Sequence, residues 1–198
     1  MPSNQRVEDS TRHGYCMPRL FAVCTPGLES FLAGELDQLG LPAIRPSSRP
    51  EYFSCTEDSA DEVGGVEIQG SLTDLYRANL HLRTASRVLR QVGGFYADSF
   101  SDLRRRARRL SWEDHLHPGQ AISLRVACHK SRLYHSGAVA EGVLEAIGGR
   151  LGQVPRVEKN ETGEDIGLPP LIVIRLVENH CTISIDSSGA LLHLTYAT

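Results

Sequence analysis

A short polar segment in the second half of the chain combines side chains that bind phosphate with side chains that stack on bases. It reads Lys130-Ser131-Arg132-Leu133-Tyr134-His135-Ser136 and lies between a predicted strand and a predicted helix. Lysine and arginine donate to phosphate oxygens, and a helix N-terminus offers unpaired backbone N–H groups and a positive dipole end. Tyrosine and histidine rings stack on unpaired bases. The segment predicts a site for an anionic polymer, with the ligands Lys130, Ser131, Arg132, Tyr134 and His135. An ordinary strand–helix loop with Ser136 as N-cap is the alternative.

Five arginines within six residues form a second candidate site, and they are Arg104, Arg105, Arg106, Arg108 and Arg109. At about 100° per residue, the apolar residues of the same segment fall on the other side of a helix. These are Phe100, Leu103, Ala107 and Leu110. Guanidinium groups this close repel one another unless water or an anion screens them. We predict Arg104, Arg105 and Arg108 as phosphate ligands, with a solvated helix face as the alternative.

The charge of the chain is unevenly distributed. The 198 residues have a net charge of −3, but residues 1–70 carry −6, residues 71–150 carry +6 and residues 151–198 carry −3. A basic middle segment favours a polyanionic partner. It contains a third arginine group, Arg77, Arg83, Arg87 and Arg90. We expect half of this group to form ion pairs with the acidic N-terminal third of the chain.

Composition excludes several classes of protein. With 40% hydrophobic residues the chain can bury a substantial core, and it has no apolar run of the roughly 20 residues that a membrane span needs. The polar residues 1–15 lack the apolar part of a secretory signal. Five cysteines without a CxxC spacing argue against a disulfide framework or a structural zinc site. We expect a soluble, cytoplasmic protein with no membrane partner.

No pattern in the sequence predicts catalysis by this chain. It has no GxSxG motif, and neither Gly64-Gly65 nor Gly148-Gly149 follows a predicted strand as a phosphate-binding loop would. His115 and His117 lack partners at metal-ligand spacing, so we predict no metal site.

A thiol enzyme using Cys128 or Cys24 is the weakest hypothesis. Cys128 and His129 would point to opposite faces of a strand, which separates a thiol from its base.

The first half of the chain predicts a ferredoxin-like order of elements, β-α-β-β-α-β, over residues 18–97. Strands are expected at 20–24, near 52–55, at 64–70 and at 87–95. Thr25 as N-cap and Pro26 in the first turn predict a helix that ends at Gly40, and Ser71 to Asp74 predict a capping box for the next helix. The expected apolar faces are Leu28, Phe31, Leu32, Leu36 and Leu39 in the first helix, and Leu72, Leu75, Tyr76 and Leu80 in the second.

The second half predicts a separate α/β unit over residues 98–198, and residues 1–17 are expected to be a disordered tail. A helix begins after Ser99, and a strand at 120–128 turns Ile122, Leu124, Val126 and Cys128 to one side. A further helix begins near Ser136. Two runs rich in β-branched residues, 171–177 and 181–186, predict a hairpin.

Several segments resemble the bacterial and archaeal THUMP-containing RNA methyltransferases. They are residues 25–29, 75–89, 112–116 and 130–139, together with Ser184-Ile185-Asp186-Ser187-Ser188-Gly189-Ala190-Leu191-Leu192-His193, which is similar to a SxDxSGxxLH hairpin. They occur in the family's order and cover residues 18–194. The resemblance implies an α+β fold, with a ferredoxin-like subdomain at 18–97 followed by an α/β THUMP subdomain at 98–198.

The resemblance also implies a function. The family's corresponding domains capture structured rRNA or tRNA for a Rossmann-like domain, which binds S-adenosylmethionine and methylates the base. That domain's Asn/Asp-Pro-Pro-aromatic motif has no match here, since Pro169-Pro170 follows leucine and precedes a strand. We therefore expect an RNA-binding, substrate-recognition module that holds no cofactor and does not methylate unaided, with a methyltransferase domain in cis or in trans. The alternative is a protein-interaction module that has lost RNA binding.

Overall fold

The computed structural model describes residues 17–44, 64–158 and 169–189 and places all of their strands in one sheet. The strand order is β2-β1-β3-β7-β6-β4-β5, and only β4 pairs in parallel, with β5 and β6. The strands are β1 (Arg19–Cys24), β2 (Gly64–Gln69), β3 (Ala85–Tyr96), β4 (Ala121–His129), β5 (Arg156–Val157), β6 (Leu171–Val177) and β7 (His180–Asp186). Four α-helices lie in this part of the chain: α1 (Glu29–Gln38), α2 (Leu72–His81), α3 (Phe100–Ala107) and α4 (Ser136–Leu151).

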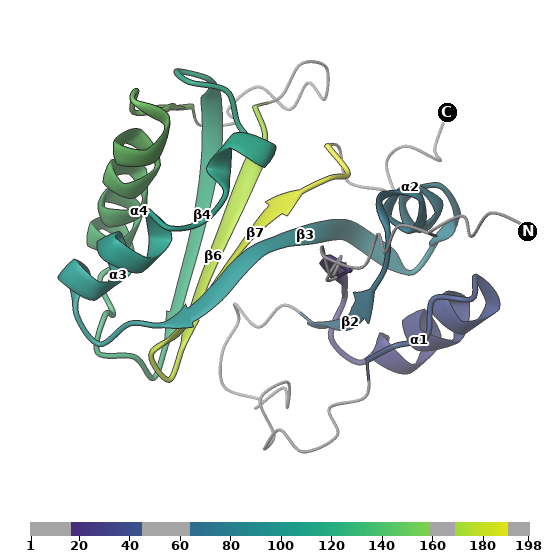
Figure 1. The fold of residues 1–198 in the computed structure, drawn as a ribbon. Coiled ribbons are helices and arrows are strands. Elements are labelled where there is room, and N and C mark those ends of the chain that lie inside the picture. Colours follow the sequence, from purple (N-terminus) through teal and green to yellow (C-terminus); the bar gives the residue numbers. More distant parts are fainter. Residues whose placement is uncertain (1–16, 45–63, 159–168, 190–198) are drawn as a thin grey trace, which may run out of the picture.

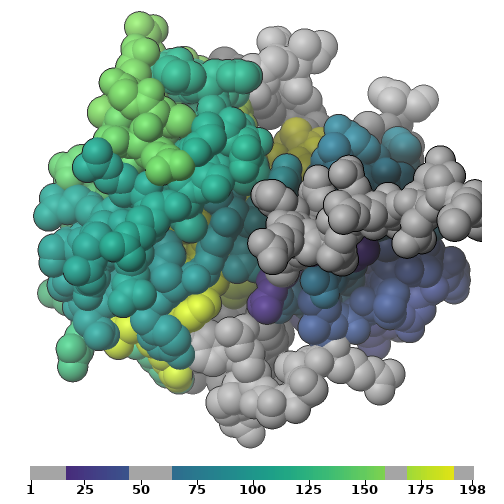
Figure 2. All heavy atoms as spheres, viewed as in Figure 1, coloured from purple at the N-terminus to yellow at the C-terminus, as the bar shows by residue number. Residues whose placement is uncertain are grey.

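The helices pack as two pairs against the sheet (Figure 1). One apolar core joins α1 and α2 to β1, β2 and the start of β3, and the other joins α3 and α4 to β4, β6 and β7. Figure 2 shows α3 and α4 in teal and green at the left of the molecule, and α1 and α2 in blue at the right. The α+β fold is confirmed. Its two units share a sheet, because β3 pairs with β1 along its first half and with β7 along its second. The boundary at residues 97/98 stays a prediction.

The first unit follows the predicted order as far as the structure describes it. The central strand β1 is antiparallel to both β2 and β3. The strand expected near residues 52–55 and almost all of the expected tail lie outside the described residues.

The predicted start of α1 is wrong. Thr25 does not cap the helix, which begins at Glu29 with Leu28 as N-cap. The backbone turns before it, since Leu28 N donates to Thr25 O and Gly27 has φ +94°. Proline and glycine in the middle of a tight turn explain this difference, because glycine alone adopts positive φ without strain.

The expected apolar faces of α1 and α2 are only partly buried. Leu32 and Leu36 pack into the core, whereas Phe31 remains 67% exposed. In α2 the buried residues are Leu75 and Ala78, while Leu72, Tyr76 and Leu80 lie on the solvent side. Because the side chain of Ala78 is small, α2 lies close to the sheet on the side of Ala78, and the three larger residues are on the other side of the helix. The capping box of Ser71 and Asp74 is confirmed.

Glu35 of α1 links both helices of the first unit to β3. Its carboxylate accepts from the backbone N–H groups of Arg83 and Thr84, at 3.0 and 3.1 Å, and from the Thr84 hydroxyl at 2.8 Å. Burial raises the pKa of Glu35, but the hydrogen bonds from Thr84 and Arg83 outweigh it and the net pKa is below the ordinary value. The ionised carboxyl therefore stabilises this junction.

We expect Glu35→Ala to lower the free energy of unfolding by about 2 kcal/mol at neutral pH, since three hydrogen bonds to a charged group are lost. A lowered pKa in the folded state stabilises the protein above the unfolded pKa of about 4.3 and ceases to do so as the pH falls through the folded value. Chemical denaturation at pH 7 and about pH 3 should show the difference between the two proteins shrinking in acid. A difference independent of pH would contradict this role for the carboxylate.

The second unit confirms the predicted helices and the hairpin. Leu103 and Ala107 of α3 face Val139, Val143 and Ile147 of α4 in the core. Trp112 is fully buried in the 3₁₀ turn after α3 (Trp112–Asp114), and its indole N–H donates to Ala107 O at 2.8 Å. Strands β6 and β7 are joined by Glu178 and Asn179, both with positive φ, as a two-residue hairpin turn requires.

The turn after β7 is anchored to the first unit. Arg87 of β3 forms an ion pair with Asp186 and donates to Gly189 O at 3.1 Å. Asn79 of α2 donates to Ser187 Oγ at 3.0 Å and accepts from Ser188 Oγ at 2.7 Å. These contacts tie the SxDxSG segment to α2 and β3. No helix in the described ranges is long and apolar enough to cross a membrane.

Candidate nucleic-acid interface

The loop between β4 and α4, residues 130–135, is held by the β6–β7 turn. Asn179 Oδ1 accepts from Arg132 N at 2.8 Å, and Asn179 N donates to Ser131 Oγ at 3.0 Å. Ser131 Oγ in turn donates to His129 O at 3.0 Å. Leu133 is 3% exposed and fixes the middle of the loop in the core. The backbone of this loop is therefore set by contacts within the protein.

Four of the five ligands predicted in this loop have exposed side chains. They are Lys130, Arg132, Tyr134 and His135. Tyr134 is 69% exposed, and its ring lies 4.1 Å from that of His135, centroid to centroid. Lys130 has φ +45°, so its backbone is in the left-handed conformation directly after the end of β4. Both hydrogen bonds of Ser131 Oγ hold the loop itself, and its role as a ligand stays a prediction.

The loop leads into an uncapped helix N-terminus. The N-cap of α4 is His135 without a side-chain hydrogen bond, so Ser136 is not the cap expected under the alternative interpretation. The first turn of α4 contains no acidic residue. The positive end of the helix dipole is therefore not compensated by a carboxylate of that turn.

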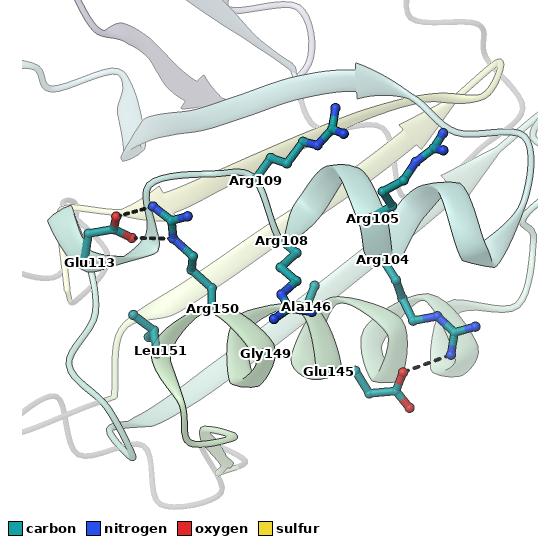
Figure 3. Close-up of a pocket in the computed structure, with 10 residues that line it drawn as sticks. All are labelled: Arg104, Arg105, Arg108, Arg109, Glu113, Glu145, Ala146, Gly149, Arg150 and Leu151. Atoms are coloured by element: carbon teal, nitrogen blue, oxygen red, sulfur yellow. Dashed lines mark hydrogen bonds and ion pairs between the residues drawn. The ribbon is translucent and has the colours of Figure 1, made fainter.

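A basic groove runs between α3 and α4 (Figure 3). Its volume is about 1020 Å³, and it is lined by Arg104, Arg105, Arg108, Arg109, Glu113, Glu145, Ala146, Gly149, Arg150 and Leu151. Arg104 pairs with Glu145 at 2.9 Å, and Arg105 pairs with Asp102 of its own helix. Arg150 pairs with Glu113 and lowers the pKa of that carboxyl to about 2. Part of the positive charge is thus compensated within the protein.

Arg108 and Arg109 form no ion pair among the described residues. A Cβ added at Gly149 would lie 3.2 Å from Arg108 Nε, so the glycine of α4 makes room for this guanidinium. Of the three arginines predicted as ligands, the structure brings all to one groove but leaves only Arg108 without an acidic partner. This difference arises because Asp102 lies one turn before Arg105 on α3, whereas Glu145 faces Arg104 from α4.

The loop and the groove are joined by α4. Gly142 of α4 packs against Leu103 and Arg104 of α3, and Gly149 packs against Arg108, so the two helices run in the same direction. The loop precedes the first turn of α4, and the arginines lie along its side.

Sequence reasoning did not identify Asn179 or Arg150. The positive φ of Asn179 explains the turn in which it lies, and nothing in its local sequence indicates the contact with a loop 47 residues away.

The third arginine group is engaged within the protein in part. Arg77 pairs with Asp74 and donates to Leu39 O, and Arg87 pairs with Asp186. Two of the four form ion pairs, but the partners do not belong to the N-terminal third as expected. Asp74 is nearer along the helix, and Asp186 is brought across from β7 by the sheet.

The cysteines do not form a reactive site in the described part of the chain. Cys128 packs against the second core, and burial raises the pKa of its thiol. Burial and the neighbouring Cys128 raise the pKa of Cys181 to about 12. A raised thiol pKa disfavours the nucleophilic thiolate. Within the described residues no three of His, Cys, Asp or Glu lie close enough to hold a metal ion.

Fold and surface together define a two-unit α+β module whose first unit is ferredoxin-like. Residues 19–89 match the family model of the RlmL ferredoxin-like domain. The ribosomal RNA large subunit methyltransferase K/L of Cellvibrio japonicus is 31% identical over 173 residues, which are 87% of this chain and 21% of that protein. The corresponding protein of Pseudomonas aeruginosa is 30% identical over 178 residues, 88% of this chain and 22% of that protein.

A solved structure has the same fold. A protein from Listeria monocytogenes, described as a predicted N6-adenine-specific DNA methylase, is 28% identical and superposes with a TM-score of 0.68 over 89% of this chain and 42% of that one. The chain is thus similar over most of its length to a part of these two large-subunit rRNA methyltransferases K/L, and the resemblance to RNA methyltransferases is confirmed. It spans about a fifth of the length of these two relatives.

Proposed function

We propose that this chain is the RNA-recognition module of a methyltransferase that acts on rRNA or tRNA. The observation that supports this best is the β4–α4 loop. There Lys130, Arg132, Tyr134 and His135 are exposed on a backbone that Asn179 holds in place, directly before the uncompensated N-terminus of α4. Two cations and two rings can bind phosphates and stack on unpaired bases without prior ordering of the loop.

The groove between α3 and α4 adds affinity that does not depend on base sequence. Arg108 and Arg109 would contact phosphates of a duplex whose end lies in the loop. Contacts to phosphates are lost steeply as salt rises, because bound counterions must be released. The proposed module therefore positions RNA mainly through its backbone.

Methyl transfer belongs to another domain in this proposal. Gly64-Gly65 lies at the start of β2, and Gly148-Gly149 lies inside α4. Neither pair therefore forms a glycine-rich loop after a strand that could hold the methyl donor S-adenosylmethionine. Because these residues do not fit that cofactor, we derive no chemical step from this chain. Its role would be to present RNA to a catalytic domain in cis or in trans.

A binding titration tests the proposal. The probes are a structured RNA with a single-stranded 3′ end, the corresponding blunt duplex and the DNA equivalent, each at two salt concentrations. We expect preference for the RNA with the unpaired end and an affinity that falls steeply with salt. Absence of RNA binding even at low salt would refute the proposal.

A protein-interaction module is the second candidate function. Leu72, Tyr76 and Leu80 are exposed at helical spacing on α2, and together with the acidic first third they favour a protein partner over RNA. Self-association or partner binding that is insensitive to salt, without affinity for RNA, would support it.

A further inference from the structure

The sheet face opposite the helices contains a hollow. None of the residues that line it was predicted as a ligand from the sequence. In the described part of the chain the four helices cover one face of the sheet, and the hollow lies on the other. Its volume is about 410 Å³, and it is lined by Arg19, Leu20, Phe21, Glu67, Leu89, Gln91, Gly94, Val173, Arg175, Val177, His180, Thr182 and Ser184. This volume lies in the range of small-ligand sites.

One wall of the hollow is aromatic and cationic. The guanidinium carbon of Arg175 lies 5.8 Å from the centroid of the Phe21 ring. Aromatic rings and guanidinium planes are the two surfaces on which unpaired bases stack. Glu67, the acidic residue of the lining, pairs with Arg19 at 3.2 Å.

The floor of the hollow carries polar groups without a partner among the described residues. Ser184 is only 6% exposed, and its hydroxyl has no hydrogen bond there. Gln91, its register partner on β3, has no side-chain hydrogen bond either. A Cβ at Gly94 would lie 3.0 Å from Gln91 Nε2 and 3.2 Å from His180 Cε1, so this glycine keeps the space above them open. Among the described residues, Arg90 Nε is the buried side-chain polar atom without a partner, so the Ser184 hydroxyl and the Gln91 amide are open to the hollow and can bond a polar ligand there.

The hollow ends at the turn that supports the proposed RNA-binding loop. Val177 and His180 line it and flank Glu178 and Asn179. Asn179 is the residue that holds Ser131 and Arg132. The two sites therefore lie on the two sides of one hairpin turn.

We propose that this hollow binds an unpaired nucleobase, stacked on Phe21 and Arg175 and hydrogen-bonded by Gln91 and Ser184. The inference rests on the proposed function in one respect: the base is supplied by the single-stranded end of an RNA whose phosphates lie on the β4–α4 loop. An amide and a hydroxyl provide both donors and acceptors, which suits the edge of a base and not a simple phosphate.

The test compares two RNAs with identical phosphates. One has an unpaired 3′ end, and in the other the unpaired nucleotides are abasic. We expect wild-type protein to bind the abasic RNA about tenfold more weakly, as the loss of one stacked base predicts. Phe21→Leu should bind both RNAs with nearly equal affinity, and Ser184→Ala should reduce the difference between them severalfold. Ser123→Ala removes a hydroxyl from β4 outside the hollow and should retain the wild-type difference. Thermal unfolding checks that each variant folds, and Ser184→Ala keeps the test valid if Phe21→Leu does not.

The outcomes separate this inference from the proposed function. Equal affinity of wild-type protein for both RNAs would overturn the nucleobase site while leaving RNA binding intact. If no RNA binds, the proposed function fails. Titration with nucleoside monophosphates then tests separately whether the hollow binds a nucleobase. Binding of a nucleotide that Ser184→Ala weakens would support a base site served by free nucleotides, and no binding of any nucleotide would overturn it.

Discussion

Replacing Lys130 and Arg132 together by alanine should weaken RNA binding at least tenfold and leave the thermal midpoint nearly unchanged. Both side chains are exposed, and no ion pair within the described residues engages either of them. Two phosphate contacts should be lost, so the slope of log affinity against log salt should fall by roughly two. The loop should keep its shape, because Arg132 contributes its backbone N–H to the bond with Asn179, and alanine retains that group.

A matched double variant separates the effect of where the charges lie from the effect of how many are removed. Arg83→Ala with Arg156→Ala removes the same two charges from exposed sites, one after α2 and one on β5. Affinity should fall far less in this control. Equal losses in the two double variants would show that binding follows net charge alone. A large loss of stability with intact binding in the first variant would remove the loop from the interface.

Replacing Asp186 by alanine should lower the free energy of unfolding by about 3 kcal/mol or more. The Asp186 side chain is 2% exposed and that of Arg87 is 22% exposed, so the variant leaves a largely buried guanidinium without its carboxylate. Asp186 Oδ1 also accepts from Ser188 N at 2.9 Å, and this bond holds the turn that Asn79 contacts. The loss should therefore extend from β7 to α2.

Chemical denaturation of the variant and of Asp98→Ala measures this effect. Asp98 is an exposed aspartate just after β3, and its replacement should change stability by less than about 0.5 kcal/mol. Hydrogen exchange should show earlier opening of α2 and of the start of β3 in Asp186→Ala. Similar stability of the two variants would mean that the anchor at Asp186 contributes little to the fold.

Local patterns predicted the secondary structure wherever the local sequence decides it. The strand with Ile122, Leu124 and Val126, the capping box of Ser71 and the hairpin after Val177 are each defined by residues a few positions apart. The start of α1 was predicted wrongly because Pro26 and Gly27 satisfy both a helix N-terminus and a tight turn. Which face of α2 is buried depends on how closely Ala78 approaches the sheet, and the helical spacing of apolar residues alone does not predict this distance.

The candidate site was predictable in composition but not in its internal partners. The types and spacing of Lys130, Arg132, Tyr134 and His135 indicated an exposed loop, and the structure describes one. That Ser131 supports the loop and that Glu145 faces Arg104 are consequences of tertiary contacts across 48 and 41 residues. The hollow lined by Phe21 and Ser184 combines strands from both units, so no segment of the sequence contains its pattern.

The shared strand β3 fixes the distance between the two units. Its twelve residues span about 40 Å and pair with β1 in the first half and with β7 in the second, with a shift of register between Gln91 and Gly93 and no linker between the units. A ladder of backbone hydrogen bonds does not swivel as a flexible connection does. Under the proposed function, an RNA end held beside α4 would therefore stay at a constant separation from α1 and α2.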